Sequence, residues 1–217
     1  MYSYRMARPS KNIDQLLLAA GRELLPMSGC AGLSVRQLVA HAGVNLGMFH
    51  YHFKTKDLFI RAVLQQVYEE MFSELTLHTG DHDAALDNLR EALVVLARFG
   101  RMHRRLLVRI LADAMSGEPL SLQFLGANLP RHVGVVGKLV RQAQRQGALV
   151  NTPAPQLVAF LAGAVAAPIL FGGALQNQLP VGAATTLVER HVLSDRAVAR
   201  RIDQALRGVE VERQSNV

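Results

Sequence analysis

Residues 32–58 read GLSVRQLVAHAGVNLGMFHYHFKTKDL, and this stretch decides the fold of the first quarter of the chain. Ser34 is a good N-cap for a short amphipathic helix that ends at Gly43. Asn45 can cap a second short helix, which reaches to about Phe53. Two short helices joined by a glycine turn are typical of a helix-turn-helix, whose second helix lies in the major groove of DNA.

Longer helices are expected on both sides of this stretch. The preceding apolar stripe has helical spacing and consists of Ile13, Leu16, Leu17, Ala20 and Leu24. Pro26 and Gly29 should stop that helix. A longer helix should run from Asp57 to about Leu77. Its predicted core residues, at steps of four, are Phe59, Val63, Val67 and Met71.

The remainder of the chain repeats the helical period and shows no alternating strand pattern. The predicted helices cover roughly 84–99, 101–116, 120–147, 155–175 and 195–208. The sequence therefore predicts an all-α protein in which a three-helix head is joined by one long helix to a larger helical body. We assign residues 1–55 to the head and residues 56–217 to the body. We expect the basic arm 1–11 to be disordered, and the alternative is that it enters the minor groove of DNA.

Composition and charge narrow the classes of function. The chain has 217 residues and a single cysteine, so it cannot form an internal disulfide, and the cytoplasm is the expected compartment. Residues 1–61 carry eight Lys or Arg against three Asp or Glu, so most of the excess positive charge lies in the first quarter. Such a region attracts a polyanion, either nucleic acid or an anionic membrane.

The residues quoted above also resemble a known family. The Ala-Gly-Val turn at 42–44, the Gly47 step, the His52-Phe53 pair and Lys56 fall in the register of the DNA-binding signature of TetR-family transcriptional regulators. The resemblance covers residues 12–60 by motif and implies a dimeric regulator, most often a repressor, that binds a palindromic double-stranded DNA operator and responds to a small-molecule effector.

The resemblance implies DNA contacts at positions on both short helices. These are Ser34, Arg36, Gln37, Asn45, Leu46, Gly47, Met48, His50, Tyr51, His52 and Lys56. An arginine at position 36 reaches a base edge in some members, and Lys56 would pair with a phosphate. Phe49 and Phe53 should instead pack inward. The sequence departs from the family at position 50, where His replaces the usual Tyr, and at Cys30, where an aromatic residue is common.

An uncharged segment from Leu157 to Leu175 is nearly long enough to span a bilayer. Pro168, the paired glycines 172 and 173, and the lack of flanking Lys or Arg favour a helix covered by protein, so we expect no membrane partner. The family resemblance implies a homodimer interface built from residues 155–175 and 195–208. Two heads are needed because one short recognition helix reads only a few base pairs.

The body should hold the effector in a cavity among the helices of about 84–175. The candidate lining residues are Met71, Phe99, Met102, His103, Phe124 and Phe160, which predict a mainly hydrophobic ligand. The arginines between Arg98 and Arg109 form either a solvated face or a site for an anionic effector or partner.

The sequence gives no positive evidence for catalysis, a metal or a cofactor. His78 and His82 fall in a predicted loop, and Cys30 has no resolving partner, so it should be a packed thiol. We therefore predict a ligand-responsive DNA-binding regulator that is not an enzyme. The alternative is an all-α enzyme or lipid-binding protein whose basic N-terminal region only increases its solubility.

Overall fold

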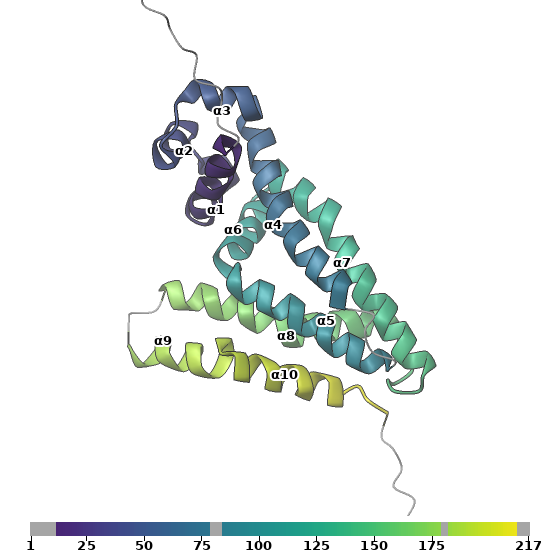
Figure 1. The fold of residues 1–217 in the computed structure, drawn as a ribbon. Coiled ribbons are helices and arrows are strands. Elements are labelled where there is room, and N and C mark those ends of the chain that lie inside the picture. The colour runs from purple at the N-terminus through teal and green to yellow at the C-terminus, as the bar shows by residue number, and fades with distance from the viewer. Residues whose placement is uncertain (1–11, 79–83, 179–181, 212–217) are drawn as a thin grey trace, which may run out of the picture. The chain divides into compact units, whose positions relative to one another are not determined.

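The fold is a succession of helices, shown as a ribbon in Figure 1. The computed structural model describes residues 12–78, 84–178 and 182–211. The helices are α1 (Ile13–Gly32), α2 (Val35–Ala42), α3 (Leu46–Phe53), α4 (Lys56–His78), α5 (Ala85–Met102), α6 (Arg104–Met115), α7 (Pro119–Arg145), α8 (Ala154–Gln178), α9 (Ala183–Val188), the π-helical turn η1 (Glu189–Leu193) and α10 (Asp195–Arg207). The prediction of an all-α protein is confirmed.

Extended pairing is limited to one short contact in the described part of the chain. Val150 N–H donates to the carbonyl of Val209 at 2.9 Å, and Val211 N–H donates to the carbonyl of Ala148 at 3.1 Å. This pairing joins the turn before α8 to the segment after α10.

The chain divides into two compact units. The first comprises residues up to Val67 together with Arg109–Phe124, and the second comprises Tyr68–Val108 and the residues from Leu125 onward. The contacts thus group the chain differently from the sequence-based division at residues 55 and 56. Residues 109–124 join the first unit because the end of α6 and the start of α7 pack against α1.

In the first unit α1, α2 and α3 pack against one another around a small apolar core (purple to blue in Figure 1). Leu17 and Leu25 of α1 are fully buried, whereas Leu16 is 50% exposed. The predicted stripe was therefore wrong at Leu16, because the buried line continues through Leu25 rather than through the half-exposed Leu24. The predicted stripe on α4 is confirmed, since all four of its residues are buried.

The end of α1 differs from the predicted stop at Pro26. The helix continues through Pro26 and is interrupted only at Gly29, whose φ of 69° and ψ of −178° are not helical. One further turn reaches Gly32 before α2 begins. A proline removes one hydrogen-bond donor, but here its cost is offset by the packing of Leu25 and Cys30, both fully buried, on either side.

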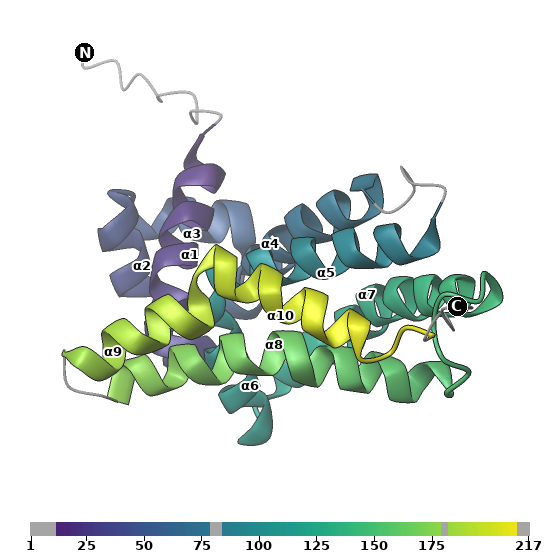
Figure 2. The same cartoon turned by 90° about the horizontal axis from the view of Figure 1, so that it is seen from below.

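In the second unit α5, α8 and α10 pack side by side, as Figures 1 and 2 show from two directions. Leu89, Leu161 and Ile202, one from each helix, are at most 1% exposed. The helical period of the sequence does not predict α9 and η1, which lie between α8 and α10 in the chain. Gly172 of α8 lies close to Val192 of η1, where a Cβ would come within 3.2 Å of that side chain.

α8 is the helix of the described chain that is long and apolar enough to cross a membrane. Its window Ala154–Gly172 has 19 residues, of which 28% are buried. Length and composition of one helix are weak evidence for a span, because a core or interface helix meets the same test. Phe160 and Phe171 are 47% and 69% exposed, so the outer side of α8 is uncovered in this chain.

Candidate nucleic-acid interface

Side-chain caps fix the start of both short helices. The Ser34 hydroxyl accepts from the N–H of Gln37 at 3.5 Å, and Asn45 Oδ1 accepts from the N–H of Met48 at 2.9 Å. Between the helices Gly43 adopts a left-handed conformation with φ 66°, and its N–H bonds back to the carbonyl of Ala40. The turn is therefore set by a glycine and two polar caps, as the sequence predicts.

The orientation of α3 follows from one buried aromatic residue. Phe49 is fully buried, and its ring lies 5.5 Å from that of Phe59 on α4, which also contacts Phe53 at 5.0 Å. The opposite face points to solvent. Leu46 is 43% exposed and Tyr51 is 70% exposed.

The other candidate residues of α3 and its cap are distributed on and beside that outer face. Asn45, Gly47 and His50 are exposed, while Met48 and His52 are half-buried. The structure thus brings together the α3 residues that the resemblance implies. They form an outer face that is apolar at its start and aromatic or imidazole-bearing at its end.

No Lys, Arg, Asp or Glu occurs within α3, so its two histidines are its only side chains that can become positively charged. His50 Nδ1 lies 3.1 Å from the carbonyl oxygen of Lys54. Because a carbonyl only accepts, Nδ1 must carry the proton, and Nε2 is the nitrogen that remains for another partner. His52 Nε2 is buried and has no hydrogen-bond partner among the described residues.

The candidates outside α3 differ in their accessibility. Arg36 and Gln37 are exposed on the first turn of α2. Lys56 is half-buried, and its ammonium donates to the carbonyl oxygen of Ala31 at 3.0 Å. The lysine therefore holds the end of α1, a contact that the sequence does not indicate because the two residues are far apart in the chain.

The six candidate effector residues differ in burial and do not all belong to one compact unit. Met71 is buried, and Phe99 and His103 lie with their rings 4.5 Å apart. Met102 is 71% exposed, and Phe160 lies on the outer side of α8. The sixth residue, at position 124, belongs to the first compact unit, whereas the other five belong to the second.

The arginines from 98 to 109 are mostly used within the protein. Arg98 pairs with Glu74 at 2.7 Å, and Arg101 pairs with Asp195 at 2.6 Å. Arg109 faces Asp113 of its own helix. Three of the five arginines thus have carboxylate partners, which leaves little of the cluster as an open anion site.

Cys30 is fully buried, and its Sγ lies 3.3 Å from the hydroxyl of Ser121. Burial raises the pKa of the Cys30 thiol to about 11, so the thiol stays protonated at neutral pH. It is a packed thiol, as the sequence analysis expects. Arg109 and Asp113 of α6 also contact this end of α1, and the sequence does not indicate these contacts.

Metal-binding clusters of three or more His, Cys, Asp or Glu are absent from the described residues. The candidate loop at 79–83, which includes His82, and the basic arm 1–11 lie outside those residues.

Comparisons with known proteins place this geometry in context. Residues 17–63 match the sequence profile described as bacterial regulatory proteins, tetR family. No curated protein matches the chain.

Three solved structures illustrate the likeness of the fold. A bacterial regulatory protein in the tetR family from Rhodococcus RHA1 has a TM-score of 0.67 at 15% identity, covering 92% of this chain and 98% of that one. A Clostridium perfringens protein described as a fatty acid metabolism regulator has a TM-score of 0.69 at 14% identity, covering 91% and 100%. A Saccharomonospora viridis protein described as a transcriptional regulator, in complex with choline, has a TM-score of 0.68 at 16% identity, covering 92% and 98%.

Proposed function

We propose that this chain acts as a ligand-responsive repressor that binds a palindromic operator as a homodimer, because residues 17–63 match the tetR-family profile and the fold is similar to that of a tetR-family regulatory protein. One observation carries the proposal. α3 is capped, held from behind by Phe49, and turned outward along Leu46, His50 and Tyr51. A short helix presented in this way fits the major groove.

The outer face of α3 suggests how a base sequence would be read. Leu46 and Met48 offer apolar contacts for a thymine methyl group, and Gly47 allows the backbone to approach the groove. Arg36, at the start of α2, can bind guanine through two hydrogen bonds, which is worth about 1–3 kcal/mol of discrimination. His50 and Tyr51 are placed to contact phosphates at the groove edge.

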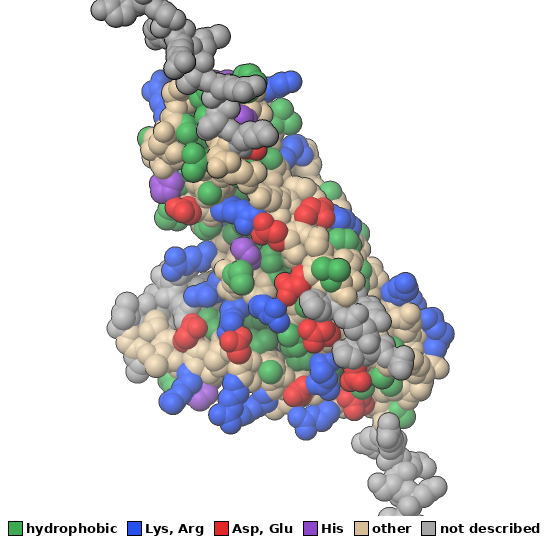
Figure 3. Space-filling view, in the orientation of Figure 1, with side chains coloured by type: hydrophobic (Ala, Val, Ile, Leu, Met, Phe, Trp, Pro, Cys, Tyr) green, Lys and Arg blue, Asp and Glu red, His purple; other side chains and the backbone are tan. Residues whose placement is uncertain are grey.

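Dimerisation through α8 explains why that helix is apolar yet uncovered. Its exposed side combines Phe160 and Phe171 with small residues such as Gly163 and Ala166. The outer side of α10 is basic, with Arg196, Arg200 and Arg207 exposed, and Figure 3 shows the resulting row of Lys and Arg side chains at the lower edge. α8 would therefore supply the apolar centre of the interface, and α10 would flank it.

An effector would bind in the second unit, near Met71 and the Phe99–His103 pair. The apolar side chains of Met71 and Phe99 favour a hydrophobic small molecule. The effector must bind two conformations of the dimer unequally, since otherwise it shifts no equilibrium. The proposed site of action is the cytoplasm, where the operator is accessible.

A gel-shift titration against salt tests this function with a matched pair of arginine variants. The native dimer should lose affinity with a slope near −0.9 per phosphate that it neutralises. Arg36→Ala should relax the preference for one or two base pairs in each half-site, whereas Arg105→Ala, a change of an exposed arginine on α6, should not. Binding that is independent of salt, or equal effects of the two variants, would contradict the proposal.

A further inference from the structure

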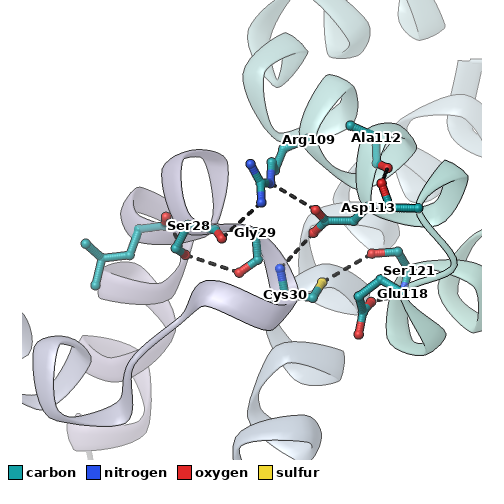
Figure 4. A network of polar contacts seen from close by, with 10 residues as sticks. Ser28, Gly29, Cys30, Arg109, Ala112, Asp113, Glu118 and Ser121 are labelled. Atoms are coloured by element: carbon teal, nitrogen blue, oxygen red, sulfur yellow. Dashed lines mark hydrogen bonds and ion pairs between the residues drawn. The ribbon is translucent and has the colours of Figure 1, made fainter.

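The junction between α1 and α2, residues 28–33, is held by side chains from three later helices. Lys56 of α4 donates to the carbonyl of Ala31 at 3.0 Å. Arg109 and Asp113 of α6 contact the main chain of Ser28 and Cys30. Ser121 of α7 contacts the Cys30 thiol. Figure 4 shows the α6 and α7 contacts at close range.

The two α6 side chains contact main-chain groups of the junction on either side of its break. Gly29 interrupts the helical hydrogen-bond pattern of α1. The N–H of Cys30, directly after the break, donates to Asp113 Oδ2 at 2.9 Å. Arg109 Nη2 donates to the carbonyl oxygen of Ser28, directly before it, at 3.3 Å. The Asp113 carboxylate therefore accepts from the N–H after the break, and the Arg109 guanidinium donates to the carbonyl before it.

The two members of the pair differ in burial, since the Arg109 side chain is 41% exposed and the Asp113 carboxylate is buried. The Asp113 side chain is only 8% exposed, although it carries a charge. Arg109 Nε lies 3.0 Å from Asp113 Oδ1, so the two side chains form an ion pair. The Nε–H group itself makes no hydrogen bond within the described residues. A buried carboxylate is stable when charge-assisted hydrogen bonds satisfy it, and here the backbone of α1 supplies one of them.

The junction leaves no room for a side chain at position 29. A Cβ on Gly29 would lie 2.4 Å from Arg109 Nε and 2.6 Å from Asp113 Oδ2. The residue after this junction, Ser34, caps α2, so the direction of α2 and α3 follows from the path of the junction. The part of α6 that holds it is continuous with Arg104–Val108, which belong to the second unit.

We propose that Arg109 and Asp113 are positioning residues for operator binding, because they fix the broken end of α1 to α6 and thereby set the direction in which α3 is presented. This inference rests on the proposed function. It assigns a role in operator binding to two residues that do not contact DNA themselves. In a dimer, a head held firmly to α6 reads half-sites at one separation. A head released from α6 tolerates other separations.

Half-site spacing provides the test, since a loss of stability alone would not change it. The operator obtained by selection with the native chain is compared with versions lengthened or shortened by one base pair at the centre. Affinities are measured for native, Asp113→Ala, Asp113→Asn and Asp87→Asn dimers at a temperature at which circular dichroism shows each variant folded. Asp87 is an exposed aspartate of α5 and serves as the control.

Asp113→Ala should bind the selected operator about 5- to 30-fold more weakly, because the Cys30 N–H loses its acceptor. Its ratio of affinities for natural and altered spacing should fall toward one, and its salt slope should stay that of the native chain. Asp113→Asn, which keeps an acceptor oxygen, should recover part of the affinity. Asp87→Asn should match the native chain.

An unchanged spacing preference in Asp113→Ala, with or without weaker binding, overturns the inference. If Asp113→Ala does not fold, Arg109→Met keeps the aliphatic stem and removes both the contact with Ser28 and the ion pair with Asp113, and the same reduction in spacing preference is expected of it. Failure of the native chain to select any duplex would instead refute the proposed function.

Discussion

Gly29→Ala should destabilise the protein far more than an ordinary glycine substitution. Gly29 combines φ 69° with ψ −178°, a conformation that only glycine adopts readily. The new methyl group would also overlap the Arg109 guanidinium and the Asp113 carboxylate, at 2.4 and 2.6 Å. The side chains on α6 would therefore have to leave the junction.

Two contributions lower the free energy of unfolding in Gly29→Ala. Backbone strain in this region of φ and ψ costs about 1–3 kcal/mol. Displacement of Asp113 leaves the N–H of Cys30 buried without its acceptor, which costs about 1–3 kcal/mol more. The free energy of unfolding should thus fall by about 2–6 kcal/mol, which is a large share of the about 5–15 kcal/mol typical of a native protein.

Gly43→Ala is the matched control. Gly43 also has a positive φ, 66°, but no atom lies within 4 Å of the position of its Cβ. Only the left-handed conformation is penalised there, by about 1–2 kcal/mol. Thermal unfolding followed by circular dichroism should show a lower Tm for both variants, with the larger decrease in Gly29→Ala, at about 2–4 °C per kcal/mol for a chain of this size.

The difference in Tm decrease between Gly29→Ala and Gly43→Ala tests whether the junction excludes a side chain. A Tm decrease in Gly29→Ala no larger than that in Gly43→Ala would show that the α1 junction accommodates a side chain, and the reasoning about Arg109 and Asp113 would be refuted.

Three further perturbations have defined outcomes. Phe49→Ala removes a fully buried ring of the head and should lower the free energy of unfolding by about 3–5 kcal/mol, measured by urea denaturation; a change below 1 kcal/mol would contradict its core position. Asn45→Ala removes the cap of the eight-residue α3 and should cost about 1 kcal/mol of helix stability, seen as roughly fivefold weaker operator binding, whereas unchanged binding would mean that the cap does not stabilise α3 in the complex. Burial lowers the pKa of His132 below its ordinary 6.5, so the native state takes up a proton less readily than the unfolded chain. The stability that this histidine contributes is therefore present above about pH 6.5 and is lost as the pH falls below it, with a slope of at most about 1.4 kcal/mol per pH unit. His132→Asn, which can still donate to the Tyr68 hydroxyl, should reduce that slope, and an identical pH dependence in the two proteins would exclude this role.

The helix-turn-helix is readable from the sequence because its signals are local. Ser34 and Asn45 cap helices within three residues of themselves, and Gly43 ends a helix in its own neighbourhood. The apolar spacing on α4 likewise predicts its buried face, since every member of the stripe belongs to one continuous helix.

Features that depend on distant partners could not be predicted in this way. The contact of Cys30 with Asp113 joins residues 83 positions apart, and that of Lys56 with Ala31 joins residues 25 apart. Neither a helical period nor a motif specifies which carboxylate will meet a broken helix end. Leu16 illustrates the same limit, because periodicity locates an apolar stripe but tertiary packing decides which of two adjacent leucines is buried.

Selection of bound sequences from a random DNA duplex pool tests most directly whether paired copies of α3 read DNA. The native chain should enrich a two-fold symmetric sequence whose half-sites lie about 10–10.5 base pairs apart, centre to centre, or a multiple of that distance. The same selection with Tyr51→Ala, which alters a side chain of α3 that is 70% exposed, should enrich that sequence less strongly. A failure to enrich any sequence, or enrichment of sequences without two-fold symmetry, would contradict the account.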